Sequence, residues 1–337
     1  MRVASASPAG ALQQPHPILK GYHRVIAGGG RVDWGADGYL YYDKLGGDGW
    51  YNVYRARPDG SGEVELNPPG VPTKHRGNPA VSPDSNWVLF QAQQQASPET
   101  TKAKPGLGVD NDIWVMRADG SAAWFLHAVT PTHAIIHPKF SPTSGSLVCW
   151  SERPGPNDDS DWFVHKADFS VVGGVPQISG DGNYSPNYFL GVFYETHGFT
   201  ALETDIVYTR SQAGQGNKFD IARMVWGSTA ETLLVASSAD WDEHANISPS
   251  GNKIVWMSSK EIGWDGTTAK LKTELWIADY PSMADQRRLT DLNVAFFPKR
   301  VVVGDMGWAP DGKSLAVRFL YGDGSEDLYV FEFWAAQ

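Results

Sequence analysis

The chain has 337 residues, of which 41% are hydrophobic and 20% are charged, so it is long enough to bury a large core. Its formal net charge is −10 and its basic residues form no stripe, which argues against a nucleic-acid partner. The single cysteine, Cys149, excludes an intrachain disulfide framework and a four-cysteine zinc site, and no run of about 18 apolar residues suggests a membrane span.

The chain starts with "MRVASASPAGALQQPHP", a stretch of small residues and proline. This stretch lacks the apolar central region of a secretory signal. We therefore expect residues 1–20 to form an extended segment ahead of the folded domain. Two interpretations stay open: a cytoplasmic protein, or an exported protein whose leader has been removed.

From residue 33 onward, a short turn followed by an apolar, β-rich run recurs six times. The copies are "DWGADGYLYY" (33–42), "AVSPDSNWVLFQ" (80–91), "KFSPTSGSLVCW" (139–150), "GFTALETDIVYT" (198–209), "NISPSGNKIVWM" (246–257) and "GWAPDGKSLAVRF" (307–319). Aligned copies lie 47, 59, 59, 48 and 61 residues apart when they are matched on Gly35, Ser82, Ser141, Thr200, Ser248 and Ala309. This spacing predicts a series of stacked supersecondary units.

Each apolar run leads into an alternating segment with a tight turn, such as "DIWVMRADGSAAWFLH" at 112–127. Alternation of period two around an Asp-Gly turn predicts a β-hairpin, so each unit should hold four short strands. The last unit stops after three strands, and "HRVIAGG" at 23–29 would supply the fourth. We predict an all-β fold: a six-bladed β-propeller of four-stranded antiparallel blades over residues 21–337, closed by an N-terminal strand. A seven-bladed ring would need a further unit within 151–195.

The motifs "SPDS", "SPSG" and "APDG" before apolar runs, together with the outer hairpin "DIWVMRADGS", give the chain a resemblance to TolB-type propeller repeats. The resemblance extends over nearly the whole chain and implies the fold. It is a weak indicator of function, because this repeat serves binding scaffolds and enzymes alike. TolB-type propellers are commonly exported. The resemblance therefore implies a periplasmic or extracellular location, with a cytoplasmic one not excluded.

One position in each unit carries a polar side chain at the start of the innermost strand. Four residues before the aligned turn residue, or three in unit four, stand Arg31, Asn78, His137, His197, His244 and Asp305. Inner strands of a propeller converge on its axis, so we expect these side chains to meet at one end of the channel. A histidine there can also be structural and bond within its own blade. The variety of residue types favours a site.

Neutral imidazoles and a carboxylate are good ligands for Mn, Zn, Ni or Fe. We predict a metal site at His137, His197, His244 and Asp305, with His244 within about 7 Å of both His137 and His197. Arg31 would pair with an anionic substrate, and Glu243, Glu195 or His75 would act as a general base. The oligogalacturonate lyases, also propellers, hold a divalent metal on axial histidines, and this chain is similar in that arrangement only.

The longest predicted loops lie on the same face as this polar ring, which favours ligand entry there. Asn78, Trp50, Tyr188 and Trp264 are the predicted substrate-binding residues, and acidic loop clusters such as "DNDIW" make Ca²⁺ an alternative ion. The leading hypothesis is a metal-dependent enzyme that acts on an anionic oligosaccharide or small molecule, as a lyase. The alternative is a non-catalytic propeller that binds a protein, a peptide or a glycan at the same mouth.

Overall fold

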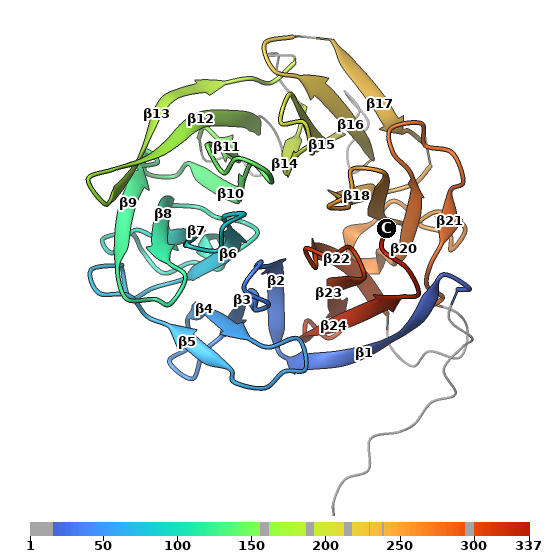
Figure 1. The fold of residues 1–337 in the computed structure, drawn as a ribbon, viewed down its shortest axis with the longest axis horizontal. Coiled ribbons are helices and arrows are strands. Elements are labelled where there is room, and N and C mark those ends of the chain that lie inside the picture. Colours follow the sequence, from blue (N-terminus) through green and yellow to red (C-terminus); the bar gives the residue numbers. More distant parts are fainter. Residues whose placement is uncertain are drawn as a thin grey trace, which may run out of the picture.

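The computed structural model describes residues 16–155, 162–186, 192–211, 218–228, 230–237, 239–293 and 300–337. In this part of the chain, six sheets stand around a central axis, and each sheet has four antiparallel strands (Figure 1). The predicted six-bladed β-propeller of four-stranded blades is confirmed.

The first three blades follow the chain from its inner to its outer strand. Blade 1 consists of β2 (Gly29–Trp34), β3 (Leu40–Leu45), β4 (Tyr51–Ala56) and β5 (Val64–Leu66). Blade 2 consists of β6 (Arg76–Val81), β7 (Trp87–Gln93), β8 (Asn111–Arg117) and β9 (Ala123–His127). Blade 3 consists of β10 (Ala134–Phe140), β11 (Leu147–Arg153), β12 (Phe163–Val172) and β13 (Val175–Asn183).

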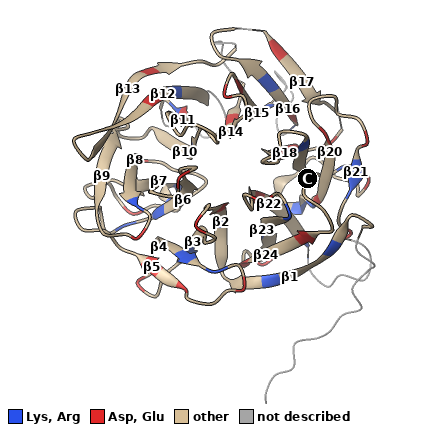
Figure 2. Cartoon of the chain, viewed as in Figure 1, with Lys and Arg blue, Asp and Glu red and all other residues tan. Residues whose placement is uncertain are grey.

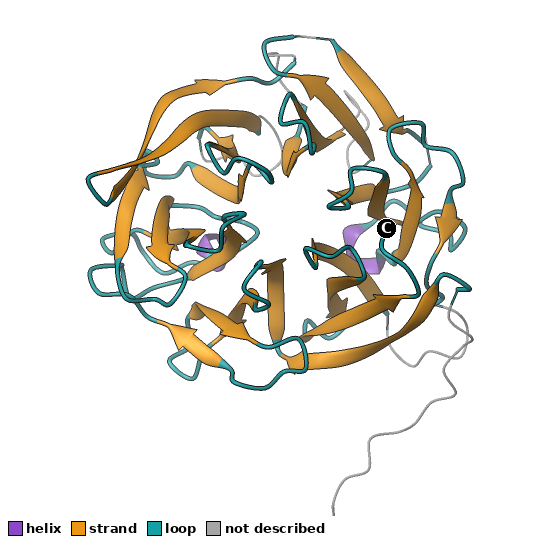
Figure 3. Cartoon of the chain, viewed as in Figure 1, coloured by secondary structure: helices purple, strands orange, loops and turns teal. Residues whose placement is uncertain are grey.

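The second half of the ring repeats this order, and one short 3₁₀ helix lies in a loop of each half (Figure 3). Blade 4 consists of β14 (Tyr194–Phe199), β15 (Asp205–Ser211), β16 (Phe219–Val225) and β17 (Glu231–Val235). Blade 5 consists of β18 (Asp242–Ile247), β19 (Lys253–Ser258), β20 (Glu274–Asp279) and β21 (Arg287–Arg288). Blade 6 consists of β22 (Val301–Trp308), β23 (Ser314–Tyr321), β24 (Glu326–Phe333) and β1 (Leu19–Ala27). The 3₁₀ helices are η1 (Thr101–Ala103) and η2 (Thr268–Lys270).

The two ends of the chain close the ring in blade 6. β1 pairs antiparallel with β24, with Tyr22 opposite Phe331. These two rings stack with centroids 4.7 Å apart, which ties the outer strand to the blade. The predicted closure by an N-terminal strand is confirmed. The region 151–195 holds the β12–β13 hairpin of blade 3, and blade 4 follows it directly in the ring.

The turn motif explains why the chain turns between the two innermost strands of a blade. The hydroxyl of Ser82 accepts a hydrogen bond from the backbone N–H of Trp87, and Ser248 accepts one from Lys253 in the same way. The serine side chain thus satisfies a backbone group that a strand would otherwise pair. The apolar run that follows is buried between neighbouring blades, as Trp256 and Trp150 are, both 0% exposed.

Every inner strand carries a β-bulge at the polar position identified in the sequence. The antiparallel register with the second strand shifts between Gly29 and Val32, Gly77 and Ala80, Ile136 and Lys139, Thr196 and Gly198, Glu243 and Asn246, and Gly304 and Met306. The backbone φ is positive within four of these bulges: at Asn78 (50°), His137 (52°), His244 (52°) and Asp305 (36°). A bulge re-aims a side chain that a regular strand would place on one of its faces. Six such bulges turn six polar side chains toward one axis.

Lysine and arginine are spread over strands of several blades (Figure 2). Within the described residues, no helix has the length and apolar character needed to cross a membrane.

Candidate metal centre on the propeller axis

The six bulge residues lie around one small axial cavity. Its volume is about 20 Å³, which admits a body of the size of one water molecule. The residues from the six blades that line it are Arg31, Asn78, His137, His197, His244 and Asp305. The convergence predicted from the register of the inner strands is therefore present.

The three imidazole rings form a triangle at this level of the axis. The ring centroid of His244 lies 5.6 Å from that of His137 and 5.6 Å from that of His197. The rings of His137 and His197 are 6.3 Å apart. The two separations from His244 lie within the range that the sequence predicts.

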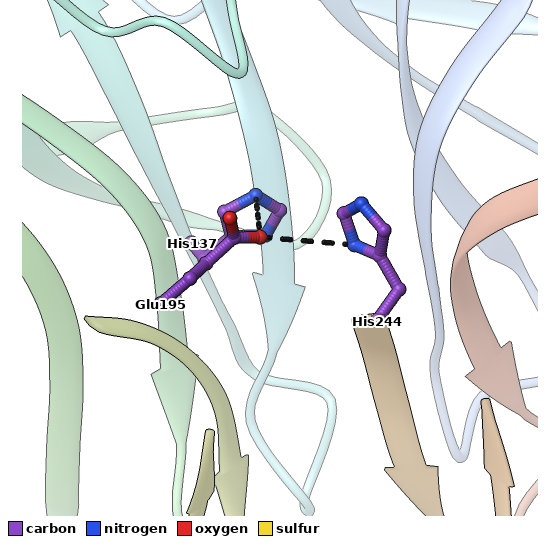
Figure 4. A group of neighbouring side chains, drawn as sticks. All are labelled: His137, Glu195 and His244. Atoms are coloured by element: carbon purple, nitrogen blue, oxygen red, sulfur yellow. Dashed lines mark ion pairs between the residues drawn. The ribbon is translucent and has the colours of Figure 1, made fainter. Parts of the chain in front are cut away.

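The group of donor atoms best placed for an ion consists of His137, Glu195 and His244, all within 4.8 Å of one another (Figure 4). Glu195 Oε1 lies 3.0 Å from His137 Nε2 and 3.7 Å from His244 Nδ1. The sequence predicts His197 and Asp305 as further ligands of the ion, and Glu195 as a candidate general base. In the structure, Glu195 stands between the two imidazoles, and His197 Nε2 contacts the hydroxyl of Thr209 at 2.6 Å.

Two further carboxylates stand near these imidazoles. Asp305 Oδ1 is 3.5 Å from His244 Nδ1, the nitrogen that also faces Glu195, and 3.8 Å from His137 Nδ1. Glu243 Oε2 is 3.7 Å from His244 Nε2. Glu243 is itself held by the indole N–H of Trp241, which donates to Oε2 at 2.8 Å. Carboxylates behind metal-binding histidines commonly fix the tautomer and the ring orientation.

The charges around the axis are paired, with the exception of Glu195. Arg318 contacts Asp305 at 2.9 Å and Glu326 at 2.7 Å. Among the described residues, no lysine or arginine forms an ion pair with Glu195, and its Oε1 accepts no hydrogen bond. This residue is only 5% exposed. A buried carboxylate is costly unless a positive charge compensates it, and either a protonated imidazole or a metal ion between the two histidines would supply that charge.

The environment separates the pKa values of these groups. Burial raises the pKa of Glu195, but His137 and the other two imidazoles outweigh it and hold the pKa at about 2. Burial and the charge of Glu195 raise the pKa of Glu243 to about 8. Burial also drives the pKa of His197 well below its ordinary value. At neutral pH, Glu195 is therefore ionised, Glu243 holds a proton and His197 is neutral.

Trp50 and Trp264, two of the aromatic residues predicted to bind substrate, are not among the residues that line the axial cavities. Trp50 packs on His75 with ring centroids 4.8 Å apart. His75 is buried, and its Nδ1 accepts a hydrogen bond from the backbone N–H of Tyr51. Trp264 packs edge-on against Trp241. The remaining predicted aromatic, Tyr188, lies outside the described residues.

The carboxylates of the acidic motif "DNDIW", which made Ca²⁺ an alternative ion, accept hydrogen bonds from backbone N–H groups. Asp110 accepts a hydrogen bond from the N–H of Thr132, and Asp112 accepts one from the N–H of Val129. These carboxylates organise the connection between blades 2 and 3.

Sequence reasoning missed the charged layer beside the ring. Asp43, fully buried, accepts hydrogen bonds from the backbone N–H groups of Arg31 and Asn78 and so joins blades 1 and 2. Arg318 holds Asp305 from the second strand of blade 6. The available signal was a charged residue inside each apolar run, in "LYYDKL" and "SLAVRFL".

The long-loop end of the axis is partly covered. The loop between β7 and β8 crosses it at Gly106, where a Cβ atom would lie 2.0 Å from Arg31 Nη2. Ala103 in the same loop is fully buried, and its carbonyl accepts a hydrogen bond from Asn111. This packing narrows the channel at the long-loop face, where ligand entry is expected from the sequence.

No protein-family model and no curated protein sequence matches this chain. Among solved structures, it is similar to a TolB candidate from Agrobacterium tumefaciens, with 15% identity, a TM-score of 0.55, and coverage of 92% of this chain and 91% of that one. TolB from Acinetobacter baumannii is 14% identical with a TM-score of 0.52, covering 96% of this chain and 66% of that one. The fold is TolB-like.

A more distant match is an oligogalacturonate lyase from Vibrio parahaemolyticus, with 14% identity, a TM-score of 0.46, and coverage of 95% of this chain and 92% of that one. At such identities, structural similarity shows the fold alone. The function of this chain has to be argued from its axial site.

Proposed function

We propose that this protein is a metal-binding propeller whose axis holds one divalent transition-metal ion between His137, Glu195 and His244. The observation that carries the proposal is Glu195, a buried and ionised carboxylate between two imidazoles, with no lysine or arginine partner among the described residues. A cation at this point would compensate that charge.

The residues present fit such an ion. Two imidazoles and one carboxylate are a donor set for Zn, Mn, Fe or Ni, and the adjoining cavity of about 20 Å³ leaves room for one further small ligand. A bound ion would supply positive charge to an anionic ligand that reaches this cavity. Glu243 stands behind His244, where it can orient the ring, and Asp305 Oδ1 contacts both histidines, His244 at 3.5 Å and His137 at 3.8 Å.

As the activity to test first, we propose β-elimination on an acidic saccharide. In that reaction a base removes the proton α to the carboxylate, a carbon–carbon double bond forms, and the β-alkoxy group leaves and takes up a proton. Glu195, ionised at neutral pH, suits the binding of the ion, whereas Glu243, protonated at neutral pH, suits donation to a leaving group. The alternative is a propeller that binds a protein, a peptide or a glycan at the same centre without catalysis.

Metal content tests the centre independently of any activity. Protein purified without a polyhistidine tag should retain a nearly stoichiometric amount of one transition metal, measured by inductively coupled plasma mass spectrometry. Glu195→Gln should lower the metal affinity at least about 100-fold, because a ligand contributes more than the outer residues whose loss costs 10–100-fold. Release of an unsaturated product from polygalacturonate, followed by its ultraviolet absorbance, then tests the lyase activity.

The matched control is His165→Gln, which removes an imidazole from blade 3 without touching the axis. It should leave the metal content unchanged, while His137→Gln should lower it. Metal-free wild-type protein that fails to take up Zn, Mn, Fe or Ni in titration calorimetry would refute the metal centre. Metal binding without turnover would favour the non-catalytic alternative.

A further inference from the structure

A second, larger cavity lies on the axis between the polar ring and the tight-turn face. Its volume is about 310 Å³, within the range of small-molecule sites. One apolar residue from each blade lines it, directly before the turn that ends the inner strand: Trp34, Val81, Phe140, Phe199, Ile247 and Trp308. Prolines of four of these turns line the same cavity: Pro83, Pro142, Pro249 and Pro310. Each blade thus contributes one apolar side chain to the wall, beside polar side chains that include Asp33, Lys139, His197 and Asn246.

One cation lies where this cavity meets the polar ring. Lys139 lines both the large cavity and the small one. Among the described residues, no carboxylate forms an ion pair with its ammonium group. The one acidic residue of the wall, Asp33, accepts hydrogen bonds from the backbone N–H groups of Val81 (2.8 Å) and Trp34 (2.9 Å). Within the described part of the wall, Asp33 is thus engaged by backbone donors, whereas the ammonium group of Lys139 has no acidic partner.

The other polar side chains of the wall are already bonded within the protein. The hydroxyl of Ser82 bonds to Asp84, that of Ser248 contacts Ser250, and that of Thr143 donates to the carbonyl of Ala201. A ligand with many hydroxyl groups would lose its hydrogen bonds to water and find few replacements here. The cavity therefore disfavours a sugar ring and favours an apolar one.

We propose that this turn-side cavity binds a small organic acid with an aromatic or branched apolar body, whose carboxylate pairs with Lys139. The apolar body would fill the space between Trp34, Phe140 and Trp308, and the acid group would point toward the polar ring. This inference concerns a different cavity from the metal centre and does not depend on a bound ion.

Titration calorimetry with 3-phenylpropionate tests the proposal. The acid should bind, and its uncharged amide should bind at least about tenfold more weakly, since the charge on the ligand meets Lys139. Lys139→Met should weaken binding of the acid by at least about tenfold, Lys139→Arg should retain it, and Lys313→Met, outside the cavity, should leave it unchanged. Melting curves establish that each variant is folded.

Two outcomes would overturn the proposal. Equal binding of the acid and the amide would show that Lys139 does not select the charge. Binding of galacturonate but not of 3-phenylpropionate would show that the walls select hydroxyl groups. Repeating the titration on Glu195→Gln separates the two sites, because binding at the turn-side cavity should survive the loss of the metal.

Discussion

At the scale of single residues, the axial site depends on strained backbone. His244 has a φ of 52°, a left-handed conformation that non-glycine residues adopt only at a cost of about 1–2 kcal/mol. His137 has the same φ, and Asp305 lies at 36°. Strain of this kind persists where the surrounding structure over-determines it and clusters at functional sites. The bulge directs the side chain to the axis, and the positive φ within it is the source of the strain.

This strain makes a prediction about two variants at one position. His244→Gly should be more stable than His244→Ala by about 1 kcal/mol, because glycine adopts a positive φ without steric cost. Both variants should lose metal affinity equally. Urea unfolding of the two metal-free proteins measures the difference. Equal midpoints would mean that the bulge relaxes when the imidazole is removed.

Arg318 is predicted to be the most costly axial charge to remove. It neutralises two buried carboxylates, Asp305 at 2.9 Å and Glu326 at 2.7 Å. Arg318→Met would leave both unpaired and should destabilise the fold by about 3–5 kcal/mol. Chemical unfolding measures the loss, and Arg24→Met, which removes an exposed guanidinium paired with Asp327, serves as the control with a change below about 1 kcal/mol.

At the scale of elements, an alternating ring of imidazoles and carboxylates joins blades 2 and 3. His127 of β9 lies 3.3 Å from Glu152 of β11 and 3.5 Å from Asp181 of β13. His165 of β12 bridges the same two carboxylates, at 3.9 Å and 3.1 Å. An imidazole donates from both nitrogens only when it is protonated. The contact between these blades is therefore tied to pH.

The sign of this pH dependence follows from two opposite pKa shifts. Burial lowers the pKa of His127, but Glu152, Asp181 and Asp112 outweigh it and raise the pKa above 6.5. This stabilisation is complete below pH 6.5 and is lost as the pH rises through the raised value. Burial raises the pKa of Glu152, but His127 and His165 outweigh it and lower the pKa below 4.5. That stabilisation is present above pH 4.5 and is lost as the pH falls.

The ring of charges should therefore stabilise the propeller most between the two ordinary pKa values. Melting temperatures measured from about pH 5.5 to 8.5 should fall more steeply for the wild type than for His127→Gln. The difference between the two proteins should shrink as His127 loses its proton. Parallel curves would show that His127 contributes nothing that depends on pH. His23→Gln, on the outer strand β1, should follow the wild type.

The sequence predicted that the histidines of the site converge on the propeller axis, but it did not predict the bulges that aim individual side chains. The period-two pattern and the repeat spacing place His137, His197 and His244 on inner strands, so their convergence follows from the fold. The bulges are not visible in that pattern, because an extra residue leaves the apolar alternation on either side intact. The ligand role that we propose for Glu195 depends on such a bulge, which begins at Thr196. The turn-side cavity depends on the packing of Trp34 and Trp308, which no local signal reveals.

At the scale of the whole molecule, the contact between β1 and β24 holds the ring closed. Tyr22→Ala would remove the ring that stacks on Phe331 and contacts Phe319, and it should destabilise the fold by about 2 kcal/mol. Because closure belongs to one cooperative structure, unfolding should stay a single transition with a lower midpoint. Lys20→Ala, on the exposed side of β1, is the control. Two separate transitions would show that blade 6 opens on its own.

Closure by the two ends of the chain also fixes when the axial site can be assembled during protein synthesis. β1 (Leu19–Ala27) is made early but has no partner until β24 (Glu326–Phe333) has been translated. His137, Glu195 and His244 therefore emerge on blades 3 to 5 before blade 6 can close the ring. If the proposed centre binds its ion only in the closed ring, the ion is taken up after β24 has been made, in the compartment where the ring closes. Since protein sites select among transition metals largely by availability, the metal supply of that compartment would then decide which ion the proposed centre holds.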